Sequence, residues 1–268
     1  GVPEVIQFDD SGNVKIFSGN DVAGDWDPNN GYKFVPEKNE DGSYKVNDGA
    51  KPTTTIPTKD LVKNLKPDAP DIKVNESDKT KITINAQAVD TDAKKIEVAY
   101  TDSEGNEKTE TATKADGKDG KWSVSEGSNI TVNPDTGVIT LEISKIKEAT
   151  KVTAKVTDNG GLEGDTDKLT SDISEIQITK AIKVEALGGL SPIDIKKWVG
   201  DELNWKDGVK AKDSATEENK GKINELLKGA TFEDVTETKR TTEKSGEFTG
   251  KIKVKFDDES KIIVENQN

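Results

Sequence analysis

The fold class follows from the stretch Lys81-Ile82-Thr83-Ile84-Asn85-Ala86, in which every second residue is apolar. Successive side chains of a strand point to opposite faces of a sheet, so this spacing predicts a strand with one buried face. The same alternation returns in residues 96–100 and 139–143. Ile and Val, which favour strands, far outnumber Leu along the chain, and the sequence therefore predicts a mainly β protein.

Short alternating runs continue outward from this stretch to residue 178, separated by turn sequences such as Asp102–Asn106 and Asn133–Gly137. Seven or eight such runs in about 110 residues are typical of an immunoglobulin-like β-sandwich. Trp122 is in phase with Val124, and we expect its side chain in the core of this sandwich.

Two changes in composition predict the domain boundaries. Prolines gather in residues 51–70, and proline is excluded from central strands. Near Lys180 pure alternation gives way to a segment that contains helix signals. We therefore expect tandem small β domains at 1–66, 67–180 and 181–268, with short linkers and little shared core.

The segment 181–268 predicts a small sheet with one helix. Ile182 and Val184 alternate as in a strand, and residues 192–199 fit a helical turn. Ser214 and Glu217 fit a capping box at the start of a helix that Gly229 ends. Strands are expected again from Phe248 to Val264, and Trp198 and Trp205 are expected to pack in the core.

The segment 1–66 is the least regular. Val5–Phe8, Val14–Phe17 and Tyr32–Val35 read as strands, and Asp9–Asn13 as the turn between the first two. These runs predict a small β segment or a truncated domain.

Composition excludes several classes of function. The chain has no His and no Cys, which rules out a Ser-His-Asp triad, a Cys-His pair, an ordinary zinc site and disulfides. Its net charge is −13 and Arg240 is its single arginine, so nucleic acid is not an expected partner. No apolar run approaches the roughly 20 residues that span a bilayer, so we expect no membrane insertion. We expect a monomer without cofactors.

Residues 180–268 resemble a Rib/alpha-like repeat module of Gram-positive surface proteins. The resemblance rests on Asp207-Gly208-Val209, on residues 235–250 with Arg240-Thr241-Thr242-Glu243 leading to Gly246, and on the hairpin 251–260. Glu259 stands where the hairpin turn of the family usually has Gly, and the helix at 215–228 makes this a longer, atypical version.

Residues 67–180 resemble a bacterial immunoglobulin-like domain of the same proteins. The matching stretches, in chain order, are Pro67-Asp68-Ala69-Pro70, Gly120-Lys121-Trp122-Ser123-Val124 and Thr157-Asp158-Asn159-Gly160-Gly161. The two resemblances imply a multi-domain, extracellular, cell-wall-anchored protein of a low-GC Firmicute, with the anchor outside this sequence.

Because the chain has no His and no Cys, carboxylates are its main candidate catalytic groups. The acidic pairs, such as Asp9 and Asp10, are sequence neighbours in turns. Neighbours in a turn do not face each other across a cleft, so solvated turn residues are the preferred interpretation and no catalytic residue is predicted. Calcium is the alternative for the loop that holds Asp158, Asn159, Asp165 and Asp167. That loop lacks EF-hand spacing, and we expect no calcium-specific stabilisation.

Trp26 and Tyr32 are the candidate ligand-binding residues, because the polar loop Gly24–Tyr32 carries two aromatic side chains among Asp and Asn. A structural plug is the alternative role. We thus expect a non-enzymatic structural or adhesive segment of a cell-surface protein, whose partner would be a host matrix protein or glycan. The alternative is a glycan- or matrix-binding accessory region of a secreted enzyme.

Overall fold

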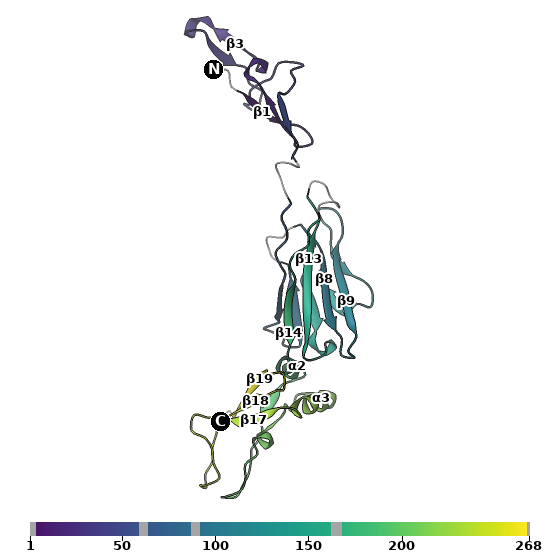
Figure 1. Ribbon diagram of the computed structural model, residues 1–268, viewed down its shortest axis with the longest axis vertical. Coiled ribbons are helices and arrows are strands. Elements are labelled where there is room, and N and C mark those ends of the chain that lie inside the picture. The colour runs from purple at the N-terminus through teal and green to yellow at the C-terminus, as the bar shows by residue number, and fades with distance from the viewer. Residues whose placement is uncertain (1–3, 59–63, 87–91, 162–167, 267–268) are drawn as a thin grey trace. The chain divides into compact units, whose positions relative to one another are not determined.

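The computed structural model describes residues 4–58, 64–86, 92–161 and 168–266. The chain is mainly β, as expected, and contains several small separate sheets. It divides into two compact units (Figure 1). Unit 1 comprises residues 1–65 and 159–169, and unit 2 comprises residues 66–158 and 170–268. The division into three domains stays a prediction.

Unit 1 has a three-stranded antiparallel sheet and a separate hairpin. The sheet contains, in order, β1 (Val5–Phe8), β2 (Val14–Phe17) and β5 (Thr54–Ile56). The hairpin pairs β3 (Gly24–Asp27) with β4 (Lys33–Pro36), and the short 3-10 helices are η1 (Gly19–Asp21) and η2 (Pro28–Asn30). Its small core is centred on Val5, Phe17 and Val22. The strands expected in this segment are confirmed, although Tyr32 lies just before β4 rather than in it.

Unit 2 begins with a sandwich of two antiparallel sheets (Figure 1). One sheet contains, in order, β11 (Ile130–Val132), β12 (Ile139–Glu142), β7 (Lys81–Asn85) and β6 (Asp71–Val74). The other contains β10 (Trp122–Val124), β9 (Glu107–Lys114), β8 (Ala93–Thr101), β13 (Thr150–Asp158) and β14 (Ser174–Ile178). In the lettering of immunoglobulin domains these orders are D-E-B-A and C″-C′-C-F-G, so the strand order is that of a variable-type sandwich.

The inner faces of both sheets share one hydrophobic core. Ile82 and Ile84 on β7 and Ile96 and Val98 on β8 are completely buried, as the alternation predicts. Trp122 is also buried, which confirms its expected place. A Cβ atom on Gly137 would lie 2.7 Å from the Trp122 ring, so the indole packs directly against bare backbone.

The rest of unit 2, residues 180–266, is called the C-terminal part. It contains α2 (Lys180–Ala186), β15 (Leu190–Pro192), η5 (Trp205–Gly208), β16 (Val209–Ala211), α3 (Glu217–Leu227), β17 (Thr231–Asp234), β18 (Lys251–Lys255) and β19 (Lys261–Glu265). β15 pairs with β16, and β17, β18 and β19 form an antiparallel sheet over a separate core. Glu259 in the β18–β19 turn has φ +72°, the left-handed conformation that glycine adopts most easily.

Several local predictions in the C-terminal part are wrong. Phe248 lies in the loop before β18 rather than in a strand. Ile182 and Val184 lie in helix α2 rather than in a strand, because the Thr179 side chain caps a helix by accepting from the Ile182 N–H. Residues 193–199 form no helical turn, since the chain leaves β15 as a loop. Helix α3 is capped by Thr216, whose hydroxyl accepts from the Asn219 N–H at 3.2 Å, and not by Ser214.

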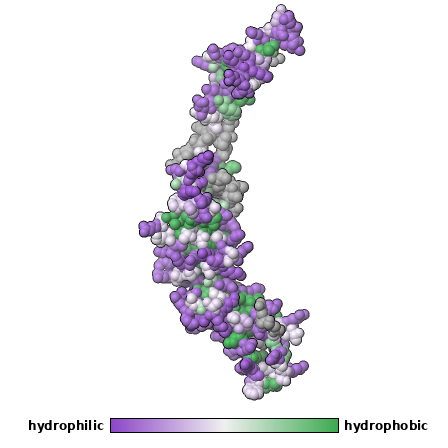
Figure 2. Space-filling view, turned by 180° about the vertical axis from the view of Figure 1, so that it is seen from behind, coloured by the Kyte–Doolittle hydropathy of each residue, from purple (hydrophilic) through white to green (hydrophobic). Residues whose placement is uncertain are grey.

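Hydrophilic residues predominate on the face of the molecule drawn in Figure 2, and hydrophobic residues gather there in smaller patches. Among the described residues, no helix combines the length and the apolarity needed to cross a bilayer.

Candidate functional sites

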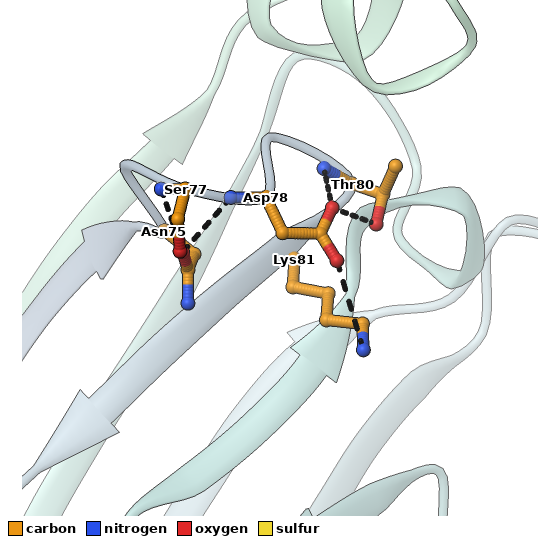
Figure 3. A network of polar contacts seen from close by, with 5 residues as sticks. All are labelled: Asn75, Ser77, Asp78, Thr80 and Lys81. Carbon is orange, nitrogen blue, oxygen red and sulfur yellow. Dashed lines mark hydrogen bonds and ion pairs between the residues drawn. The ribbon is translucent and has the colours of Figure 1, made fainter.

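The turn between β6 and β7 holds the polar network drawn in Figure 3. The Asn75 Oδ1 accepts hydrogen bonds from the backbone N–H groups of Ser77 and Asp78 at 2.9 and 3.0 Å. The Asp78 Oδ1 accepts from the Thr80 N–H at 3.0 Å and from its hydroxyl at 2.6 Å. The Lys81 ammonium lies 3.7 Å from the other carboxylate oxygen. These neighbours satisfy the carboxylate, so the turn has a structural role.

The same turn recurs along the chain, with an Asp side chain that accepts from the N–H of the residue two positions later. Further examples are the pairs Asp9 and Ser11, Asp41 and Ser43, Asp102 and Glu104, Asp234 and Thr236, and Asp258 and Ser260. The hydroxyl and N–H groups of Ser43 and Thr80 lower the pKa values of Asp41 and Asp78. Acidic residues in these turns therefore stabilise the turns through local hydrogen bonds. This agrees with the interpretation that they are turn residues rather than catalytic ones.

Asp258 also connects two elements of unit 2. Its second oxygen accepts from the Lys180 N–H at 2.7 Å, and the Ser260 hydroxyl accepts from the Ala181 N–H at 3.1 Å. The β18–β19 turn thus caps the start of α2. Partial burial raises the pKa of Asp258, but the hydrogen bonds from Ser260 and Lys180 outweigh this effect and lower it overall.

These lowered pKa values predict how stability depends on pH. The fold favours the ionised carboxylates, so their stabilisation is complete above the unfolded-state pKa of about 4. It is lost as the pH falls through the lower pKa values of the folded state. We expect the free energy of unfolding, measured by urea titration from neutral pH to pH 3, to fall below about pH 4. Asp258→Asn should flatten this fall, because the amide does not titrate; parallel pH profiles for the two proteins would contradict the assignment.

Of the three aspartates predicted as calcium ligands, only Asp158 lies among the described residues. Asp158 ends β13 with its side chain almost completely buried, after a register shift in the pairing with β8. Asp165 and Asp167 lie outside the described residues. In the described part of the chain, no group of three or more carboxylates is placed to hold a metal ion. Calcium binding by this loop stays a prediction, and the burial of Asp158 separates its carboxylate from solvent.

The predicted ligand-binding residues Trp26 and Tyr32 belong to the β3–β4 hairpin of unit 1, and both side chains are exposed, by 57% and 69%. The Trp26 ring contacts the Phe34 ring edge-on at a centroid distance of 5.6 Å. Asp27 accepts from the Asn29 N–H at 2.9 Å and so begins η2 between the two aromatic residues. The hairpin therefore presents two aromatic surfaces to solvent, and a ligand role for them stays a prediction.

The most unusual polar side chain is one that sequence reasoning missed. Lys183 on α2 is only 5% exposed, and its ammonium donates hydrogen bonds to the backbone carbonyls of Ile143 at 3.0 Å, Ser144 at 3.2 Å and Ile146. These carbonyls belong to the sandwich, in and just after the 3-10 helix η3 (Ile143–Lys145). Burial lowers the pKa of Lys183, while the Glu148 carboxylate acts in the opposite direction.

Helix α2 also packs against both hydrophobic cores of unit 2. Ile182 and Ala186 pack against the sandwich core, whereas Val184 and Leu187 belong to the core of the C-terminal part. The sequence signal of this arrangement was the helical spacing of two apolar pairs after the N-cap Thr179, namely Ile182 with Ala186 and Val184 with Leu187. The two cores are separate clusters and α2 packs against both, so the independence of the two domains stays a prediction.

The two tryptophans of the C-terminal part differ in burial. Trp205 is partly buried against the core, as expected, and its ring lies 4.8 Å from the Arg240 guanidinium. Trp198 is 84% exposed, so its predicted core position is wrong. It lies in a loop, where its backbone N–H donates to the Asp201 carboxylate at 2.9 Å.

In comparisons with protein-family models, curated proteins and solved structures, the chain matches none of them.

Proposed function

We propose that the chain is a non-enzymatic segment of a bacterial cell-surface protein, in which small β domains serve as a stalk or present ligand-binding loops. The observation that carries this proposal is the joint at α2. One short helix contributes apolar side chains to two cores and inserts the Lys183 ammonium among three carbonyls of the sandwich. Domains joined only by a flexible linker need no such contact. A stalk, in contrast, depends on a fixed orientation between neighbouring domains.

The carboxylates give further support for a structural role. Asp41 and Asp78 owe their lowered pKa values to hydrogen bonds of their own turns. Asp258 owes its lowered pKa to its own turn and to the Lys180 N–H at the start of α2. General acid–base catalysis instead requires a perturbed group that faces a substrate site. The net charge of −13 would keep a surface segment soluble and well separated from its neighbours.

The surface location can be tested with an antibody raised against the chain and applied to intact cells of the source organism. We expect labelling without permeabilisation, and loss of the label after brief protease treatment of the intact cells. A cytoplasmic protein of the same cells serves as the control for leakage. Labelling that requires permeabilised cells would contradict the proposal.

A glycan- or matrix-binding accessory region of a secreted enzyme is the second candidate, and the exposed rings of Trp26 and Tyr32 favour it. Binding to a glycan array or to matrix proteins that Trp26→Ala abolishes would support this role. A catalytic domain in the same polypeptide would then favour the accessory region of an enzyme over a stalk.

A further inference from the structure

A groove of about 680 Å³ lies in the C-terminal part, between the loops 193–204 and 236–250. Both loops project from the region of the small sheet below β17 (Figure 1). The groove contains the segment around Arg240 and reaches Gly208 on its floor. Gly208 and Arg240 belong to the stretches 207–209 and 240–243 that were singled out in the sequence. The packing of α2 and of the C-terminal core does not fill the groove beside them.

The two loops are fastened to each other. The Gly200 N–H donates to the Thr242 carbonyl at 2.9 Å, and the Thr242 hydroxyl donates to the Asp201 carbonyl at 2.6 Å. Within the first loop, the Trp198 N–H donates to the Asp201 carboxylate at 2.9 Å. The walls of the groove are therefore held by hydrogen bonds before any ligand arrives, which lowers the entropic cost of binding.

Arg240 is fixed at the base of the second loop. Its backbone N–H and one guanidinium nitrogen donate to the Asp234 carboxylate at 2.9 and 3.1 Å, and the guanidinium lies over the Trp205 ring. The Arg240 Nε is buried and has no acceptor among the described residues. The bare backbone of Gly208 completes the floor, where a Cβ atom would lie 2.7 Å from Ile252.

The rim of the groove carries exposed apolar side chains. Trp198 is 84% exposed, Val199 60% and Phe248 46%. Gathered apolar side chains on a concave surface of so polar a chain mark an interaction site, whereas single ones need no explanation.

The charge of the lining points to the kind of ligand. Four cations line the groove, namely Lys196, Lys197, Arg240 and Lys244, against the two carboxylates of Asp194 and Glu247. Arg240 is already paired with Asp234, so the three lysines give the lining a small excess of positive charge. The rest of the chain is strongly acidic, since the net charge is −13. This small local excess of positive charge on an acidic protein favours an anionic partner through charge complementarity.

We propose that this groove binds an anionic polysaccharide. The C–H face of a pyranose ring would stack on the Trp198 indole, and carboxylate or sulfate groups would pair with Lys196 and Lys197. The Thr241 and Ser245 hydroxyls in the lining match sugar hydroxyls as hydrogen-bond partners. A peptide that adds as a strand would need free backbone groups along a wall of the groove, whereas the Thr242 carbonyl and the Gly200 N–H are already bonded to each other. This inference does not rest on the stalk role.

The test uses the full chain and isothermal titration with hyaluronan and with heparin, and with dextran and polyglutamate as neutral and peptide controls. We expect at least one of the two anionic polysaccharides to bind, and the affinity to fall at high salt. Trp198→Ala and the double variant Lys196→Gln/Lys197→Gln should each weaken binding about tenfold or more. Circular dichroism of each variant checks that it is folded.

Matched controls come from elsewhere in the chain. Phe8→Ala removes an exposed aromatic side chain from unit 1, and Lys220→Gln/Lys222→Gln removes two charges from α3, so neither should change the affinity. The proposal is overturned if neither anionic polysaccharide binds at about 1 mM sugar. It is equally overturned if dextran or polyglutamate binds as well, or if Trp198→Ala retains full affinity.

Discussion

Replacement of Lys183 by Met is expected to lower the free energy of unfolding of unit 2 by about 3 kcal/mol. Methionine keeps most of the aliphatic chain but removes the ammonium that donates to the carbonyls of Ile143, Ser144 and Ile146. These acceptors lie where α2 packs on the sandwich, so the lost bonds are not readily replaced by water. The joint between the sandwich and the C-terminal part should therefore weaken.

Urea denaturation followed by circular dichroism measures the loss, and hydrogen exchange of the α2 amides locates it. Lys145→Met is the matched control, because Lys145 lies in the neighbouring η3 with an exposed side chain, and its replacement should cost less than about 0.5 kcal/mol. Equal stabilities of the two variants would show that the buried ammonium does not hold the joint.

Trp122→Ala is expected to destabilise the sandwich by about 3–5 kcal/mol, the usual cost of deleting a buried aromatic side chain. The indole is 7% exposed and packs on the backbone of Gly137, so its removal leaves a cavity that rigid strands on both sides fill poorly. The loss should appear as faster hydrogen exchange of the amides in β8 and β13.

Trp198→Ala provides the comparison within the same unit. That side chain is 84% exposed, and its deletion should change stability by less than about 0.5 kcal/mol. A cost below about 1 kcal/mol for Trp122→Ala would mean that the core does not depend on this residue.

The candidate sites were only partly predictable. Trp26 and Tyr32 stood out because aromatic residues within a polar loop break the local pattern, and both are exposed in the hairpin. Lys183 and the groove at Trp198 did not stand out, because each depends on partners distant in the sequence, such as Ile143 for the first and Thr242 for the second. No local pattern encodes these pairings.

The amino-acid sequence by itself determined the strands of the sandwich, because the two-residue alternation of Ile82 and Ile84 needs only the geometry of a strand. It also determined the turns closed by aspartates such as Asp78, since their hydrogen bonds join residues two positions apart. Tertiary structure alone decided that Lys183 is buried while Trp198 is exposed. Burial depends on which surfaces meet in space: α2 lies between two cores that satisfy both its faces and its ammonium, whereas the loop of Trp198 is tied to another loop away from either core.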